Sequence, residues 1–128
     1  MAELMIISET GMFHSACRFT LSSSVEWRGF QPARSRTPVG RGKVERVDRT
    51  PHINHFIRFD VDESVLRRAM NTVTTDYASK NYVLGVVDCV SFTADVAREC
   101  RLRVPRVNMT PYGFIRVLTW WNDYIEFK

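Results

Sequence analysis

Alternation of apolar and polar residues along Phe13–Leu21 is the feature that most constrains the fold of this chain. The odd-numbered residues of this segment fall on one face of an extended chain, and the even-numbered residues, His14 among them, fall on the other. A period of two predicts a strand. Three serines, Ser22–Ser24, then favour a turn, and Val25–Phe30 has the composition of a second strand. We therefore expect a β-hairpin.

Two more apolar segments, Leu4–Ile7 and Ile53–Val61, predict strands on either side of this hairpin. Beyond the second segment the apolar residues recur at helical spacing. Helices are expected over residues 62–79, from Cys89 onward and over residues 110–124. Strands followed by helices predict the α+β class, with a small antiparallel sheet packed against helices.

The first and last helices carry recognisable start signals. Asp62 and Thr110 are expected to be N-caps, and Pro111 occupies the first helical position after Thr110. The last helix is expected to bury one apolar stripe, formed by Phe114, Ile115, Leu118 and Trp121.

Length and composition indicate a single ordinary domain spanning residues 1–128. The chain has 128 residues, of which 45% are hydrophobic and 25% charged. No apolar run approaches the roughly 18 residues that a membrane span needs. The first residues carry acids and no basic segment, so we expect synthesis in the cytoplasm without a signal peptide. Three cysteines, Cys17, Cys89 and Cys100, are then expected to be reduced thiols.

A basic segment at about residues 33–50 interrupts this pattern. It combines Pro38, Gly40 and Gly42 with no hydrophobic period, which favours a long mobile loop. Its cations are Arg34, Arg36, Arg41, Lys43, Arg46 and Arg49. Such a loop can contact a polyanion, but a solvated insertion is the more common case. No aromatic residue lies among the cations, so no stable nucleic-acid partner is expected.

Cys89 stands where an apolar run turns into a helix. Unpaired N–H groups at a helix start favour the thiolate and can hold the oxyanion of an acyl transfer. A base is also needed, and the chain offers His14, His52 and His55. The alternative is that Cys89 is a small buried hydrophobe, as we expect for Cys17 and Cys100. No CxxC or HxxxH spacing occurs, so neither a metal nor another cofactor is expected.

The order of these segments adds a resemblance. A strand histidine in FHSACRFTL, a hairpin partner ending in GFQP and, much later, DCVSFTADVA follow one another in the chain. This order, from about Met12 to Leu118, resembles the circularly permuted NlpC/P60 branch of papain-like cysteine hydrolases. It is similar in particular to small domains of bacterial toxins that are delivered by type VI secretion. The resemblance implies a permuted papain-like arrangement of the α+β fold.

The resemblance also implies a set of catalytic residues. Cys89 matches the nucleophile and His14 the general base, with sulfur and ring nitrogen within about 4 Å of each other. A third polar residue on the hairpin partner strand orients the imidazole, and Glu26 is the candidate because a carboxylate stabilises imidazolium. Asp88 precedes the nucleophile and serves the turn, the oxyanion site or simply the helix cap. The implied reaction is thiolate acyl transfer on an amide or ester.

The implied substrates are a peptidoglycan amide, a protein side-chain amide or a lipid ester. A delivered antibacterial effector would act in the periplasm or cytoplasm of a target cell. Its partners would be a cognate immunity protein and a component of the secretion machinery. Two other classes stay open: a non-catalytic binding or adaptor domain in which Cys89 is packing, and a polyanion-binding module that uses the basic loop. Fast alkylation of Cys89 would indicate an enzyme, and salt-dependent binding would indicate the polyanion module.

Overall fold

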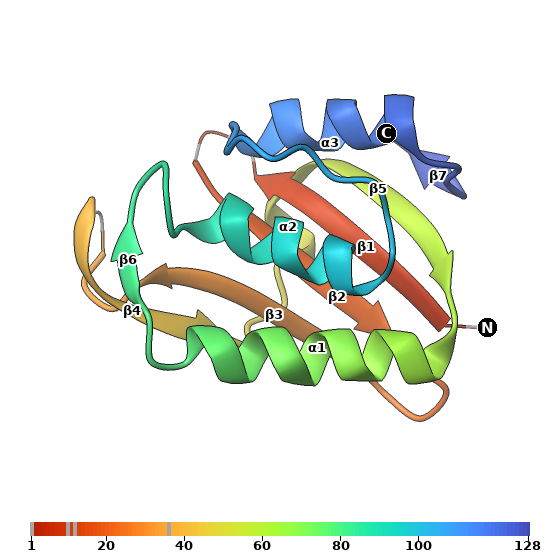
Figure 1. Cartoon of the computed structure of the whole chain (residues 1–128), viewed down its shortest axis with the longest axis horizontal. Coiled ribbons are helices and arrows are strands. Elements are labelled where there is room, and N and C mark those ends of the chain that lie inside the picture. The colour runs from red at the N-terminus through yellow and green to blue at the C-terminus, as the bar shows by residue number, and fades with distance from the viewer. Residues whose placement is uncertain (1, 10, 12, 36) are drawn as a thin grey trace.

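In the residues that the computed structural model describes, 2–9, 11, 13–35 and 37–128, seven strands form one antiparallel sheet (Figure 1). The strand order is β6-β4-β3-β2-β1-β5-β7. The strands are β1 (Ala2–Glu9), β2 (Ser15–Thr20), β3 (Val25–Pro32), β4 (Val39–Glu45), β5 (Ile53–Val61), β6 (Asn81–Val83) and β7 (Glu126–Phe127).

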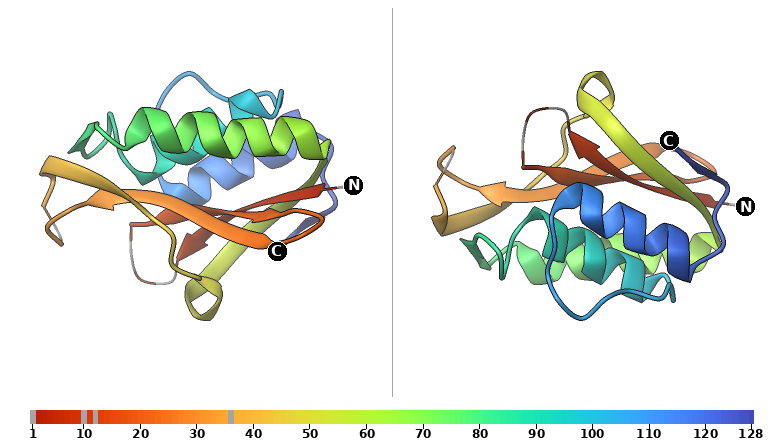
Figure 2. Two further views of the ribbon diagram at one scale, coloured as in Figure 1. Left: turned by 90° about the horizontal axis from the view of Figure 1, so that it is seen from below. Right: turned by 90° about the horizontal axis from the view of Figure 1, so that it is seen from above.

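The helices cover one face of this sheet. They are α1 (Glu63–Tyr77), α2 (Cys89–Glu99) and α3 (Pro111–Trp121), and both views of Figure 2 show them on the same side. The connection from β4 to β5, which contains the short 3₁₀ helix Thr50–His52, crosses the opposite side. The α+β class predicted from the sequence is confirmed. None of the helices in the described residues has the length and apolar character needed to cross a bilayer.

The predicted hairpin is confirmed, because β2 and β3 pair with Cys17 opposite Arg28. Both outer strands of the prediction are also present as β1 and β5, which pair with each other. Alternation sorts the side chains as expected. Residues such as Cys17 and Phe19 are buried against the helices, whereas Ala16 belongs to a smaller apolar cluster on the other face.

Aromatic side chains join the sheet to the two central helices. Tyr77 of α1 packs edge-on against Phe30 of β3, with ring centroids 4.9 Å apart, and against Phe92 of α2, at 5.0 Å. Cys17 and Cys100 lie in this core, as predicted. The core therefore extends from β3 across α1 to α2, and it fixes how α2 lies on the sheet.

The predicted helix signals are confirmed only in part. Thr110 caps α3, because its hydroxyl accepts a hydrogen bond from the N–H of Gly113. Asp62 occupies the N-cap position of α1, but its carboxylate accepts from the Ser64 hydroxyl and not from a main-chain N–H. Trp121 does not belong to the buried stripe of α3. It is 47% exposed, and Val117 is buried in its place.

The prediction of a loop over the whole basic segment was wrong, because β4 lies within it. Residues 42–45 of β4 pair with β3 and residues 39–41 pair with β6, so each half of the strand takes part in a ladder. Gly42 packs against the Phe30 ring with no room for a side chain, and the carbonyl of Lys80 is only 2.9 Å from the place of a Cβ. Because the inward-facing residue here is a glycine, the sequence lacks the alternation of apolar and polar residues by which a strand is recognised.

The contact of Gly42 with the Phe30 ring predicts a stability defect. Gly42→Ala should lower the free energy of unfolding by about 1–3 kcal/mol, because a new methyl overpacks the core. Urea denaturation would measure this loss. Gly40→Ala on the same strand is the control, since its methyl would meet only the Thr37 methyl, at 3.3 Å. Equal stability of the two variants would contradict the packing of β4 on Phe30.

Candidate active site

Asp88 fixes the start of α2, and therefore the position of Cys89. Its fully buried carboxylate accepts hydrogen bonds from the N–H groups of Val90, at 3.1 Å, and Ser91, at 3.0 Å. The Asp88 N–H in turn donates to the Ser91 hydroxyl, which completes a capping box. The same carboxylate also accepts from the N–H of Gly85 and from the side-chain amide of Asn108. Asp88 is thus a helix cap that also holds the preceding turn.

Cys89 itself is buried, with 1% of its surface exposed. Its thiol lies 3.9 Å from the Phe13 carbonyl oxygen, to which it donates. Burial, and then the negative charge of Asp88, raise the pKa of the Cys89 thiol to about 12, although nearby N–H groups, that of Ser15 foremost, act to lower it. The prediction that the helix start lowers this pKa was wrong, because desolvation and the capping carboxylate outweigh the nearby N–H groups.

His14 lies directly before β2 and forms a short buried hydrogen bond. Its Nε2 lies 2.6 Å from Oε1 of Glu45, and both side chains are almost fully buried. A second carboxylate, that of Glu9, lies 3.8 Å from the same nitrogen and is bound by the Arg49 guanidinium, at 2.7 Å. These four residues are called the His14–Glu45 cluster below. The β4–β5 connection supplies Arg49, so this crossing segment closes the cluster on the face opposite the helices.

The Glu45 carboxylate has room because the neighbouring residue on β3, Gly29, has no side chain. Gly29 of β3 pairs with Glu45, and a Cβ at Gly29 would lie 3.1 Å from Glu45 Oε1 and 3.3 Å from the Ala16 methyl. Burial acts to raise the pKa of the Glu45 carboxyl, but the His14 hydrogen bond and charge, with Arg49 and Lys43, bring it below its usual value. Glu45 is therefore ionised at neutral pH.

Glu45, and not Glu26, is the carboxylate that bonds His14. Glu26 lies opposite Phe19, farther along the β2–β3 ladder, and its carboxylate accepts from Arg28 at 3.3 Å. Sequence reasoning missed Glu45 because the basic segment was interpreted as a loop. The available signal was the alternation of Gly40, Gly42 and Val44 with charged residues, which a strand would explain.

The two other histidines have different surroundings. His55 lies 3.2 Å from the Lys128 carbonyl through Nδ1 and stacks on Tyr112, with ring centroids 4.2 Å apart. His52 ends the 3₁₀ helix and is exposed. His14 is the histidine whose neighbour in the chain, Phe13, touches Cys89.

The structure brings Cys89 to the main chain beside His14, but the two side chains have separate partners. Among the hydrogen bonds of the described residues, the thiol reaches the Phe13 carbonyl and the imidazole reaches Glu45. No direct hydrogen bond joins the two in that part of the chain. A separation of about 4 Å between sulfur and ring nitrogen therefore stays a prediction.

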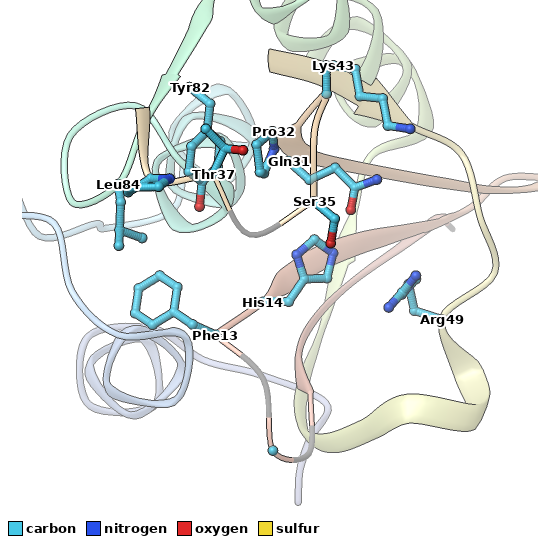
Figure 3. Close-up of a pocket in the computed structure, with 13 residues that line it drawn as sticks. Phe13, His14, Gln31, Pro32, Ser35, Thr37, Lys43, Arg49, Tyr82 and Leu84 are labelled. Carbon is cyan, nitrogen blue, oxygen red and sulfur yellow. The ribbon is translucent and has the colours of Figure 1, made fainter. Parts of the chain in front are cut away.

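A cavity of about 510 Å³ opens beside His14 (Figure 3). Phe13, His14 and Tyr82 line it, together with the end of β3, the β3–β4 connection and Lys43 of β4. Tyr82 also lies close to Cys89. Burial raises the pKa of the Tyr82 phenol, and the neighbouring Cys89 and Asp88 raise it further. Phe13 and Tyr82 thus neighbour both the cavity and Cys89, which does not itself line the cavity.

Within the described ranges, no three His, Cys, Asp or Glu side chains are placed to hold a metal ion. Comparison of the chain with protein-family models, curated proteins and solved structures found no match. What the site can do is therefore argued from its geometry.

The ionised Glu45 predicts a pH-dependent contribution to stability. Because its pKa is lowered by folding, the stabilisation is complete above the unfolded pKa near 4.5 and is lost as pH falls through the folded pKa. Glu45→Gln should cost about 1–3 kcal/mol at pH 7. Below about pH 5, the free energy of unfolding should also fall less steeply with decreasing pH in this variant than in the wild-type protein. Denaturant titrations across this range would measure both, with the more exposed Glu26→Gln as the weaker control.

The raised pKa of Cys89 predicts slow alkylation at neutral pH. In the native protein, reaction of this thiol with iodoacetamide should keep accelerating up to about pH 11, because the thiolate is scarce below its pKa near 12. Peptide-level mass spectrometry would follow each cysteine separately, and unfolded protein is the control. A plateau of the Cys89 rate below pH 8 would contradict the buried, protonated thiol.

Proposed function

We propose that this chain is a cysteine hydrolase of the amidase or peptidase type. Cys89 is the nucleophile, His14 the general base and Glu45 the carboxylate that orients the imidazole. The observation that carries the proposal is the buried 2.6 Å hydrogen bond between His14 and Glu45, one residue away from the carbonyl that the Cys89 thiol contacts. A base held by a carboxylate beside a helix-start thiol is the arrangement that nucleophilic catalysis uses. The resemblance to permuted NlpC/P60 domains supports the same roles for Cys89 and His14.

The proposed mechanism is general-base catalysis and not attack by a preformed thiolate. With a pKa of about 12, the Cys89 thiol keeps its proton in the resting enzyme. As the sulfur attacks the carbonyl carbon, this proton passes to His14, and the Glu45 carboxylate stabilises the imidazolium. The leaving amine or alcohol then takes the proton from His14, and water hydrolyses the thioester. The enzyme is regenerated without an external co-reactant.

The oxyanion of the tetrahedral intermediate needs donors near the sulfur. Asp88 uses the N–H groups of Val90 and Ser91 for the cap, so the N–H of Cys89 is the helix-start donor for the substrate oxygen. Cys89 does not line the cavity, whereas its neighbours Phe13 and Tyr82 do. Productive binding therefore requires the sulfur to become accessible from the cavity.

The biological setting rests on the resemblance alone. It supports an antibacterial effector delivered by type VI secretion, acting on a peptidoglycan amide in a target cell and held inactive by an immunity protein. A protein amide or a lipid ester is the alternative substrate.

The burial of Cys89 supports a second candidate function. A cysteine that is 1% exposed and does not line the cavity also suits a non-catalytic binding domain, in which Cys89 is packing and the cavity binds a ligand. Slow alkylation is expected for both candidate functions, so thiol reactivity does not distinguish them. Turnover of a substrate distinguishes the hydrolase from the binding domain.

Cysteine variants on one helix provide the test. Cys89→Ala should abolish release of soluble fragments from purified peptidoglycan, measured by chromatography, with protein amides and short-chain esters assayed in parallel. Cys100→Ala, a buried cysteine at the other end of α2, should lower stability without losing turnover. Because Cys89 is also in the core, Cys89→Ala should itself cost some stability. Far-UV circular dichroism verifies that both variants fold.

Expression in a bacterium, directed in turn to the cytoplasm and to the periplasm, tests the setting. Growth arrest in one compartment that depends on Cys89 and His14 supports the effector and locates its substrate. Turnover that survives Cys89→Ala contradicts the proposed mechanism. The absence of Cys89-dependent turnover on all three substrate classes contradicts the hydrolase and leaves the binding domain.

A further inference from the structure

The cavity beside His14 has an uneven distribution of charge. Its described lining includes two cations, Lys43 and Arg49, and no Asp or Glu. The carboxylates nearest to it, Glu9 and Glu45, belong to the His14–Glu45 cluster and are buried. A ligand in the cavity therefore meets positive charge directly, while the compensating negative charge lies behind the wall.

The two cations differ in how strongly they are already engaged. The Arg49 guanidinium makes two hydrogen bonds to Glu9 and lies 3.9 Å from Glu45, so its charge is largely neutralised within the protein. Lys43 is exposed and takes part in no ion pair within 4 Å among the described residues. Lys43 is consequently the cation that can bind a ligand anion without breaking an existing pair.

The other side of the cavity is apolar. Phe13 and Leu84 are 46% and 48% exposed, which is a high exposure for large hydrophobic side chains, and both line the cavity with Tyr82. Figure 3 shows Phe13 and Leu84 on one side of His14, and Lys43 and Arg49 on the other. Gln31 and Ser35 lie on the cationic side and supply hydrogen-bonding groups. His14, the proposed base, stands between the two halves.

From this division we infer that the cavity binds amides or esters that carry a carboxylate on one side of the scissile bond and an apolar group on the other. The carboxylate lies at Lys43, and the apolar group packs on Phe13 and Leu84. The scissile carbonyl then lies near His14. This inference deepens the proposed function, because it assigns the substrate class of the same site, with Lys43 as the residue that selects it.

Binding of two matched anilides tests the inference without turnover. Adipic acid monoanilide carries the carboxylate, and hexanoic acid anilide is its neutral counterpart. Both would be titrated into Cys89→Ala protein, and amide chemical shifts in β4 and β6 would report the affinity. The anionic anilide should bind at least about fivefold more tightly at low salt, and the difference should shrink as salt screens the charge.

Charge variants on one strand decide whether Lys43 is responsible. Lys43→Gln should abolish the preference for the anionic anilide. Arg41→Gln removes an exposed cation from the same strand outside the cavity and should preserve the preference. Equal binding of the two anilides, binding of neither, or a preference that survives Lys43→Gln overturns the inference. Failure of the proposed function is read separately, as a lack of Cys89-dependent turnover in the wild-type protein.

Discussion

The buried carboxylate of Asp88 is the interaction on which the candidate site depends. Burying a charge without partners is costly, and here four donors from three segments satisfy it. Two come from the first turn of α2, one from the turn after β6 and one from Asn108 ahead of α3. These bonds fix the helix start, and so they fix the place of Cys89 against Phe13, which precedes β2, and Ser15, which begins it. The same negative charge also raises the pKa of the thiol that it positions.

The two halves of the proposed catalytic pair are held by opposite faces of one sheet. Cys89 belongs to the core between the sheet and the helices. His14 shares its face with Ala16 and joins the cluster that the β4–β5 connection closes on the other side. The main chain at Phe13 and His14 is the only link between them that the described hydrogen bonds show. The thiol and the imidazole–carboxylate pair are therefore buried on opposite faces, and the proposed proton transfer requires the two side chains to approach each other.

Desolvation acts to raise the pKa of both Cys89 and Glu45, but the net pKa shifts of the two groups have opposite directions. For Cys89 it dominates, because the opposing N–H groups are weaker than burial together with the Asp88 charge. For Glu45 it is overcome, because a histidine and two cations surround the carboxylate. A protonated thiol and a carboxylate-bound imidazole are suited to the proposed proton transfer during attack and not to a resting thiolate–imidazolium pair. Lys43, one of these cations, also lines the cavity, so the same charge acts on Glu45 and on the proposed ligand.

The sequence by itself determined the α+β class, the β2–β3 hairpin, β5, the three helices and the Thr110 cap, because periodicity and capping are local properties. It also placed Cys17 and Cys100 in the core and Cys89 at a helix start. Only the tertiary structure decided that β4 is a strand, since its inward glycine is explained by the Phe30 ring across the sheet. The partner of His14 depends on the register of three strands and lies 31 residues away in the chain. The pKa of Cys89 depends on burial, a property that no local pattern contains and that outweighs the nearby N–H groups.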